Sequence, residues 1–356
     1  MNRGTYMAVP PGAVIPGVLP DFRIYVLTPQ GRYLLWALEG NKVTPEQLAK
    51  LTEGGCTEVY VDLEEQFKYE QYLETNLGGI LDNKAASDDQ KAAIFSRVSA
   101  NVVKGAFESS LGFGAMGEAA FQRTHKLIEN ALMFIKESKS LQALSKMIGH
   151  DYQTYEHATK VLWFTVAFLQ RHSEILEQIN PGYGGFEEIR QAETLRQCAV
   201  GGLLHDIGKS FVSHAILDKT EPLSEVEWEI MKRHPLTGLA MLLDTDLPLF
   251  VKKGVLHHHE DFHGGGYPLS LEGPNINTLA RVLRIIDVFD AMTSRRPYKE
   301  PMAPLKAAQI MIGEPAERKG VEDPKQDERD QGMRRCFDRE LLKKFIVFLG
   351  DVNIGA

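Results

Sequence analysis

The sequence predicts a mainly α-helical protein in which a helical bundle follows a small α+β module. Two observations indicate this fold class. After Lys91, amphipathic patterns with the helical period follow one another, and strand signals are nearly absent. Before that residue, short apolar runs alternate with turn residues, which is typical of a small mixed domain.

The first 85 residues form the predicted α+β module, whose role the sequence does not indicate. A turn at Gly31 separates two apolar runs and predicts a hairpin. Thr44 followed by Pro45 is an N-cap with proline at the first helical position, so a helix should run from there to Leu51. The strand candidates are Phe22–Leu27, Tyr33–Leu38 and Val59–Val61.

The helical part begins after a polar stretch at residues 83–90, the predicted linker. We expect a linking helix within residues 86–120 and a helical domain over residues 121–356. A charge-dense loop is predicted at Glu314–Arg334. The predicted helices are Ala92–Ser109, Glu118–Ser138, Leu141–Gly149, Tyr155–Leu176, Phe186–Leu204, Glu225–Met231, Pro235–Leu243, Pro248–His258, Asn277–Thr293, Ala303–Gly313 and Phe337–Leu349.

Composition limits the partners. The net charge is -8, from 40 basic and 48 acidic residues, which argues against binding to duplex nucleic acid. The three cysteines lie in no CxxC pattern, as expected for reduced thiols. The apolar stretches are too short to span a bilayer as helices. We therefore expect a cytoplasmic protein without a membrane span.

Histidines and acids form an ordered set in the helical part. None of the 11 histidines precedes His125, and five lie between His234 and His263. The set begins at Gly202–Lys209 (GLLHDIGK), where adjacent residues diverge by about 100° around the helix axis. His205 and Asp206 can therefore reach one cluster from two directions. Taken by itself, this segment is explained about equally well as an ordinary helix C-terminus, with a histidine that favours the helix dipole and a capping glycine.

The next histidines are weaker signals when taken singly. His234 precedes a proline that starts a helix, and by itself is an ordinary histidine. Three histidines at 257–259 follow an apolar run and lead into a glycine-rich loop, so a helix end could present two of them to one site. The alternative is an exposed histidine tract that binds metal ions only non-specifically. Because no strand precedes the GGGYP loop, a dinucleotide-binding reading fails.

Asp287 is the last member of the set. It lies in an apolar helix between isoleucine, valine, phenylalanine and methionine, where a carboxylate needs a partner. A metal ion is the simplest partner. The alternative is an internal salt bridge with Arg284 or Arg295.

Taken together, these motifs resemble the HD-GYP family of the HD phosphohydrolase superfamily over roughly Phe121 to Leu349. Several motifs occur in the family's order, which makes the resemblance specific. They are GLLHDIGK at Gly202–Lys209, HxxxG at His234–Gly238, HHE at His258–Glu260, GxGYP at Gly264–Pro268 and DVFDAMTSRRPYK at Asp287–Lys299.

The resemblance implies a bacterial signalling enzyme, a phosphoric diester hydrolase that cleaves cyclic di-GMP to pGpG, GMP or both. Asp206 would bridge two metal ions, and Lys209 would touch a phosphate oxygen during catalysis. Lys209, Tyr267, Arg296 and Lys299 would bind substrate. The implied metal ligands are His157, His205, Asp206, His234, His258, His259 and Asp287.

The implied cofactors are two divalent metal ions, iron or manganese, with zinc, nickel and magnesium as alternatives. A ligand set of imidazoles and carboxylates without thiolate suits such ions. The mechanism that follows is attack on the phosphodiester by a hydroxide bridging the two ions. Besides cyclic di-GMP, a homodimer and signalling proteins are the expected partners.

Two positions depart from the family's pattern. Members with three metals carry a glutamate where this chain has Gln153, so we predict a two-metal site. His263 replaces the usual aspartate before the first glycine of the GYP loop, which leaves loop anchoring and substrate preference open. The segment Arg171–Arg190 is longer than usual and fits either a lid or a dimer contact.

Other functions stay open at this point. The chain could be a catalytically weak or inactive receptor or adaptor that binds a cyclic dinucleotide or a protein partner. It could be an HD phosphohydrolase acting on nucleotides, which the combined GYP and RPYK motifs disfavour. It could also prefer another cyclic dinucleotide, such as cyclic GMP–AMP.

Overall fold

The structure, a computed structural model, describes residues 5–84, 86–110, 116–135, 154–182, 187–295, 300–313 and 333–351. The chain separates into two compact units, Met1–Val98 and Ser99–Ala356. The boundary between them falls within helix α4 (Asp88–Ser110). The division at residues 85 and 120 stays a prediction.

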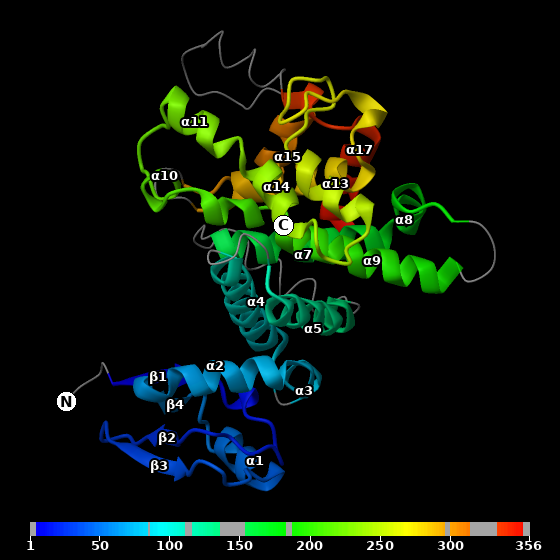
Figure 1. The fold of residues 1–356 in the computed structure, drawn as a ribbon. Helices are drawn as coiled ribbons and strands as arrows, with labels where there is room; N and C mark the ends of the chain where they lie inside the picture. Colours follow the sequence, from blue (N-terminus) through cyan, green and yellow to red (C-terminus); the bar gives the residue numbers. More distant parts are fainter. Residues whose placement is uncertain are drawn as a thin grey trace. The chain divides into compact units, whose positions relative to one another are not determined.

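The first unit is built on a four-stranded antiparallel sheet with the order β1-β4-β2-β3 (Figure 1). The predicted hairpin corresponds to β2 (Ile24–Leu27) and β3 (Tyr33–Ala37), and the third predicted strand to β4 (Val59–Asp62). Strand β1 (Tyr6–Val9) was not predicted, because four residues beside prolines give little periodic signal.

Helices α1 (Pro45–Glu53), α2 (Gln66–Thr75) and α3 (Leu77–Asp82), together with the first half of α4 and the short helices η1 (Pro11–Ala13) and η2 (Leu63–Glu65), belong to this unit. Helix α1 begins at the predicted cap, where Thr44 and Gln47 form a capping box. Helices α2 and α3 were not predicted. They contribute to the core, in which the buried rings of Phe22 and Tyr69 pack edge to face at 5.4 Å.

The second unit is helical, so the predicted fold class is confirmed. Its central helices, α7 and α9, pack side by side (Figure 1). The elements are α5 (Glu118–Ile135), α7 (Thr154–Arg171), α8 (Ser173–Ile179), α9 (Glu187–Leu204), η3 (Ile207–Phe211), α10 (His214–Leu217), α11 (Glu225–Met231), α12 (His234–Leu242), α13 (Leu249–His257), η4 (Gly273–Asn275), α14 (Thr278–Thr293), α15 (Pro304–Ile312) and α17 (Arg339–Asp351).

The core of this unit lies where α7 meets α9, α14 and α17. Gly202 of α9 allows the close approach of α7, because a Cβ there would lie 3.3 Å from the Cα of Leu162. On the other side, the rings of Phe164 and Phe289 meet edge to face at 5.5 Å, and Phe345 packs against both. This packing fixes the position of α7 relative to α14, and therefore the relative positions of the polar residues on these two helices.

The predicted helix Tyr155–Leu176 is two helices. The backbone leaves the helical region at His172 (φ −127°, ψ 64°), and α8 starts at the next residue. The imidazole of His172 packs on Phe168 at 4.9 Å, and the change of direction buries Ile175, Leu176 and Ile179. The apolar period continues through this point, so the sequence carried no signal for the break.

Several predictions fall on residues outside the described ranges. These are the helix Leu141–Gly149, the start of the helix predicted from Phe186, most of the loop Glu314–Arg334, and Gln153. Among the helices that the structure describes, none has both the length and the apolar character needed to cross a bilayer.

Candidate metal centre

Seven imidazoles and carboxylates from five separate segments converge inside the second unit. Each ligand-type side chain stands at or near a helix end, or on one face of a helix. The helices α7 and α14 supply His157 and Asp287, and the start of α12 supplies His234. His205 and Asp206 form the turn between α9 and η3, and His258 and His259 directly follow α13.

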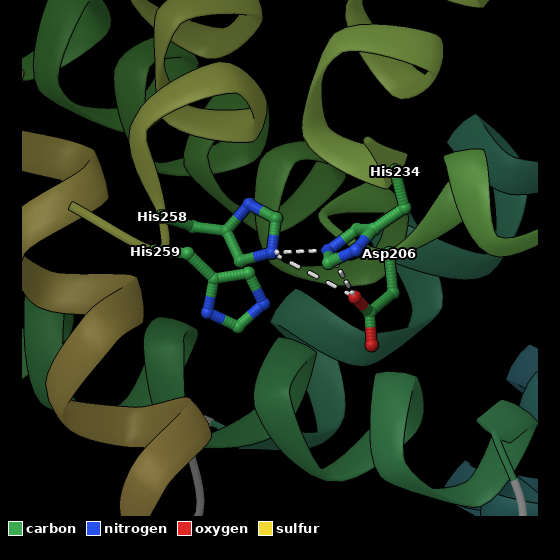
Figure 2. Close-up of side chains that lie close together, drawn as sticks. All are labelled: Asp206, His234, His258 and His259. Atoms are coloured by element: carbon green, nitrogen blue, oxygen red, sulfur yellow. Dashed lines mark hydrogen bonds and ion pairs between the residues drawn. The ribbon is translucent and has the colours of Figure 1, made fainter. Parts of the chain in front are cut away.

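Four of these residues form a first group, Asp206, His234, His258 and His259, whose ligand atoms all lie within 4.8 Å of one another. Figure 2 shows their side chains pointing toward one another from different helices. Asp206 Oδ1 lies 3.2 Å from His234 Nε2 and 3.7 Å from His258 Nε2. The two imidazole Nε2 atoms are 3.2 Å apart. This is the arrangement of a buried cation site.

The other three residues, His157, His205 and Asp287, form a second group of the same kind. His157 Nε2 lies 3.1 Å from Asp287 Oδ1 and 3.2 Å from His205 Nε2. Asp206 faces this group too, because its Oδ2 lies 3.3 Å from His205 Nε2. One carboxylate therefore has an oxygen directed toward each group, as expected of a bridging ligand.

The hydrogen bonds of the imidazoles fix which nitrogen carries the proton. His205, His234 and His258 each place Nδ1 at 2.6–2.8 Å from the carbonyl oxygen three residues earlier in the chain. A carbonyl only accepts, so each Nδ1 is the N–H donor. In the neutral ring Nε2 then carries a lone pair.

The resulting lone pairs face one another, as they do in a site that holds cations. His234 and His258 direct two such Nε2 atoms at each other at 3.2 Å. His157 does the same toward His205, because its own Nδ1 donates to Asp290 at 2.7 Å. Asp206 Oδ1 is buried and receives no hydrogen bond from the part of the chain that the structure describes. Facing lone pairs repel unless a cation lies between them, so the residues present fit two metal ions.

Burial sets the charge of the ligands. Desolvation lowers the pKa of His258 to about 4 and that of His259 well below its usual range. Both rings are therefore neutral near pH 7, the form that binds metal. For Asp206 burial acts in the opposite direction, but Lys209 and His205 outweigh it and hold the pKa of this carboxyl well below its usual range. Asp206 is thus ionised.

Two sequence-predicted substrate residues lie at the edge of this cluster. Lys209 Nζ donates to Asp206 Oδ2 at 2.6 Å and remains partly exposed. The ring of Tyr267 stacks on His259 at 4.8 Å between centroids, and Trp228 of α11 meets Tyr267 edge to face at 6.1 Å. This aromatic series leads from a ligand of the first group to the half-exposed indole of Trp228.

The GYP loop is held by a residue that the sequence did not single out for that role. Glu260 is buried, and its two carboxylate oxygens accept hydrogen bonds from the backbone N–H groups of Leu269 and Leu271 at 2.6 and 2.9 Å. His263 is exposed, with Nδ1 3.2 Å from the carbonyl oxygen of Arg335. It lies with Asp261 and Cys336 in a third group of ligand-type atoms, in which Asp261 is paired with Arg284.

The alternative explanations for single motifs fail against this geometry. The histidines at 257–259 do not form a surface tract, because His257 and His258 are buried and His259 is largely so. Asp287 is paired with His157, while Arg284 is bound to Asp261 and Arg295 lies near Glu300. Arg296 and Lys299 lie outside the described residues, so their roles stay predictions.

Sequence reasoning also missed three buried residues next to His157. Asp290 follows Asp287 by one helical turn, and Ser294 follows Asp290 by one more. Lys160 lies one turn after His157 on α7. The available signal was the second acid of the DVFDAMTS segment, which stands on the same apolar helix as the first.

Comparisons with known proteins agree with the fold. Residues 188–319 match the family model described as HD domain, so this part of the helical unit is similar to HD domains. A cyclic di-GMP phosphodiesterase of Pseudomonas aeruginosa is 31% identical over 223 residues, which are 62% of this chain and 45% of that protein. A 3'3'-cGAMP-specific phosphodiesterase of Vibrio cholerae is 38% identical over 109 residues, 31% of this chain and 24% of that protein.

A solved structure, an HDG"Y"P protein from Bdellovibrio bacteriovorus, shares the fold with a TM-score of 0.56 at 16% identity, covering 97% of this chain and 99% of that one. The predicted resemblance to the HD-GYP family is confirmed by the match to the HD-domain model and by the curated phosphodiesterases, and the solved structure shows the same fold. The matches span less than half the length of the first curated relatives.

Proposed function

We propose that this protein is a metal-dependent phosphodiesterase that hydrolyses cyclic di-GMP to pGpG, GMP or both. The observation that carries the proposal is the pair of buried ligand groups that share Asp206, with imidazole lone pairs directed into each. Paired metal ions of this kind serve phosphodiester cleavage in many enzymes. The Pseudomonas relative is named for the same substrate.

The residues divide the task. When bound, the two ions would lower the pKa of a water molecule and neutralise charge on the phosphodiester. Lys209, at the edge of the cluster, can place its ammonium on a non-bridging phosphate oxygen. Burial raises the pKa of Tyr267, so its phenol stays protonated and can donate a hydrogen bond to the substrate. Arg296 and Lys299 are proposed to hold phosphates or guanines.

Anaerobic purification, elemental analysis and then an assay of cyclic di-GMP turnover test this proposal. We expect about two equivalents of iron or manganese per chain and release of a linear product. Metal-replete protein that binds cyclic di-GMP without cleaving it would instead be a receptor or adaptor. Since the Vibrio cholerae relative is named for 3'3'-cGAMP, the same assay should include that dinucleotide.

Removal of metal by a chelator is expected to abolish turnover and to lower the thermal midpoint. The facing lone pairs at 3.2 Å lose the cations that compensate them. Bound metal at about a hundredfold excess over its Kd stabilises the folded state by about 2.7 kcal/mol. Circular dichroism melts with and without chelator measure the shift, and adding Mn²⁺ back is the control. A thermal midpoint and a turnover rate that do not change with chelator would contradict the proposed metal centre.

Replacing Tyr267 with alanine is expected to raise KM about tenfold with a smaller change in kcat. The ring stacked on His259 and beside Trp228 offers a face to a guanine base, and such stacking contributes about 1–3 kcal/mol. Tyr267→Phe separates ring from hydroxyl, because it keeps the stack and loses the donor. An unchanged KM in Tyr267→Ala would remove Tyr267 from the substrate site.

A further inference from the structure

A buried chain of hydrogen bonds lies behind His157, on the side of the ring away from the other ligands. Asp290 Oδ2 accepts from His157 Nδ1 at 2.7 Å. Asp290 Oδ1 accepts from the Ser294 hydroxyl at 3.0 Å. Ser294 Oγ in turn accepts from Lys160 Nζ at 2.8 Å, and this ammonium lies 3.8 Å from Asp290 Oδ1.

Every member of this chain is withdrawn from water. Asp290 and Ser294 have no exposed surface, and Lys160 is 6% exposed. Burying a carboxylate and an ammonium costs free energy that an apolar pair of similar volume would avoid. The hydrogen bonds reduce this cost, because both carboxylate oxygens of Asp290 and the hydroxyl oxygen of Ser294 each accept a hydrogen bond. A purely structural link between α7 and α14 does not need these charges.

The arrangement determines the state of His157. A carboxylate on Nδ1 holds the proton there and orients the ring, so that the Nε2 lone pair faces His205 and Asp287. The negative charge also makes the imidazole a stronger ligand. Lys160 lies at the far end of this series of hydrogen bonds, where it offsets the charge of Asp290. His205, His234 and His258 have neutral backbone carbonyls in the corresponding place.

We infer that Asp290, supported by Lys160 and Ser294, is a positioning residue that gives the second ligand group its metal affinity. The inference rests on the proposed metal centre and not on the identity of the substrate. It predicts a selective effect: loss of Asp290 should weaken the ion held by His157, His205 and Asp287, and leave the ion at His234, His258 and His259 in place.

Titration of metal-free full-length protein with Mn²⁺, followed by electron paramagnetic resonance of the unbound ion, counts the sites and their affinities. Wild type should bind two Mn²⁺. Asp290→Ala should retain one tight site and bind the other about 10–100-fold more weakly. Asp290→Asn keeps the size and one acceptor but loses the charge. Its affinity at this site should lie between those of wild type and Asp290→Ala. Lys160→Met and Ser294→Ala should shift the same site by less.

The matched control is Thr293→Val. Thr293 is the buried neighbour of Ser294 on α14, and its hydroxyl donates to the carbonyl of Phe289 instead of to Asp290. This variant should bind both Mn²⁺ as wild type does. Circular dichroism establishes that each variant is folded, and the isosteric Asp290→Asn decides the matter if Asp290→Ala does not fold.

Two unchanged sites in Asp290→Asn and Asp290→Ala overturn the inference, as does equal weakening of both sites in folded protein. Wild-type protein that binds no Mn²⁺ overturns it as well. Failure of the proposed function has a different signature, in which wild type binds two Mn²⁺ and Asp290→Ala binds one tightly, but neither hydrolyses cyclic di-GMP.

Discussion

Asp206→Ala is expected to lower cyclic di-GMP turnover by at least about 10³-fold and to reduce bound metal in the same sample. Asp206 directs Oδ1 toward His234 of the first ligand group and Oδ2 toward His205 of the second. Its removal should therefore affect both ions, and several kcal/mol of transition-state stabilisation depend on them. Turnover assays and elemental analysis on the same preparation measure the two effects.

Asp218→Ala is the matched control, because Asp218 is an exposed carboxylate paired with His214 in the same unit. It should keep both metal content and rate. Full activity in Asp206→Ala would refute the assigned role of Asp206, and loss of rate with both metals retained would restrict that role to the substrate.

Gly208→Ala is expected to destabilise the protein by about 1–3 kcal/mol and to reduce activity sharply. A Cβ at this position would collide with the carbonyl oxygen of His234 and come within 2.5 Å of the Gly238 nitrogen. Both contacts are backbone atoms, so α12 must move, and His234 moves with it. A thermal melt and a turnover assay detect the two consequences.

Gly350→Ala serves as the control for this prediction. Gly350 lies in α17, and a Cβ there meets no atom within 4 Å. Alanine in a helix should leave stability unchanged or raise it by up to about 1 kcal/mol. A Gly208→Ala protein that melts and turns over like wild type would show that α12 does not need the close approach to η3.

The helices were predictable where their apolar period was long and their ends carried caps. The helix beginning at Thr44 is one case, and α14 with Asn277 as its cap is another. The break at His172 was not predictable, because burial of α8 decides it and the periodicity runs on. Strand β1 was missed for a related reason, since its pairing with β4 comes from far along the chain.

The sequence indicated which residue types belong to the site and in what order they occur. The role of each residue was harder to predict. Residues 205, 206, 258 and 259 occur as adjacent pairs, which is a local signal. His157 entered only through the resemblance to a family. Asp290 could not be assigned, because its partner His157 lies 133 residues away and a second acid on an apolar helix has no specific meaning by itself.

The sequence by itself determined the class of fold and the imidazoles and carboxylates available to bind metal, because periodicity and residue type are local properties. Only the tertiary structure decided which nitrogen of each ring faces the cations, that Asp206 reaches both groups, and that Lys160, Ser294 and Asp290 stand behind His157. These depend on contacts between helices distant in sequence, where packing and burial fix each side chain's direction.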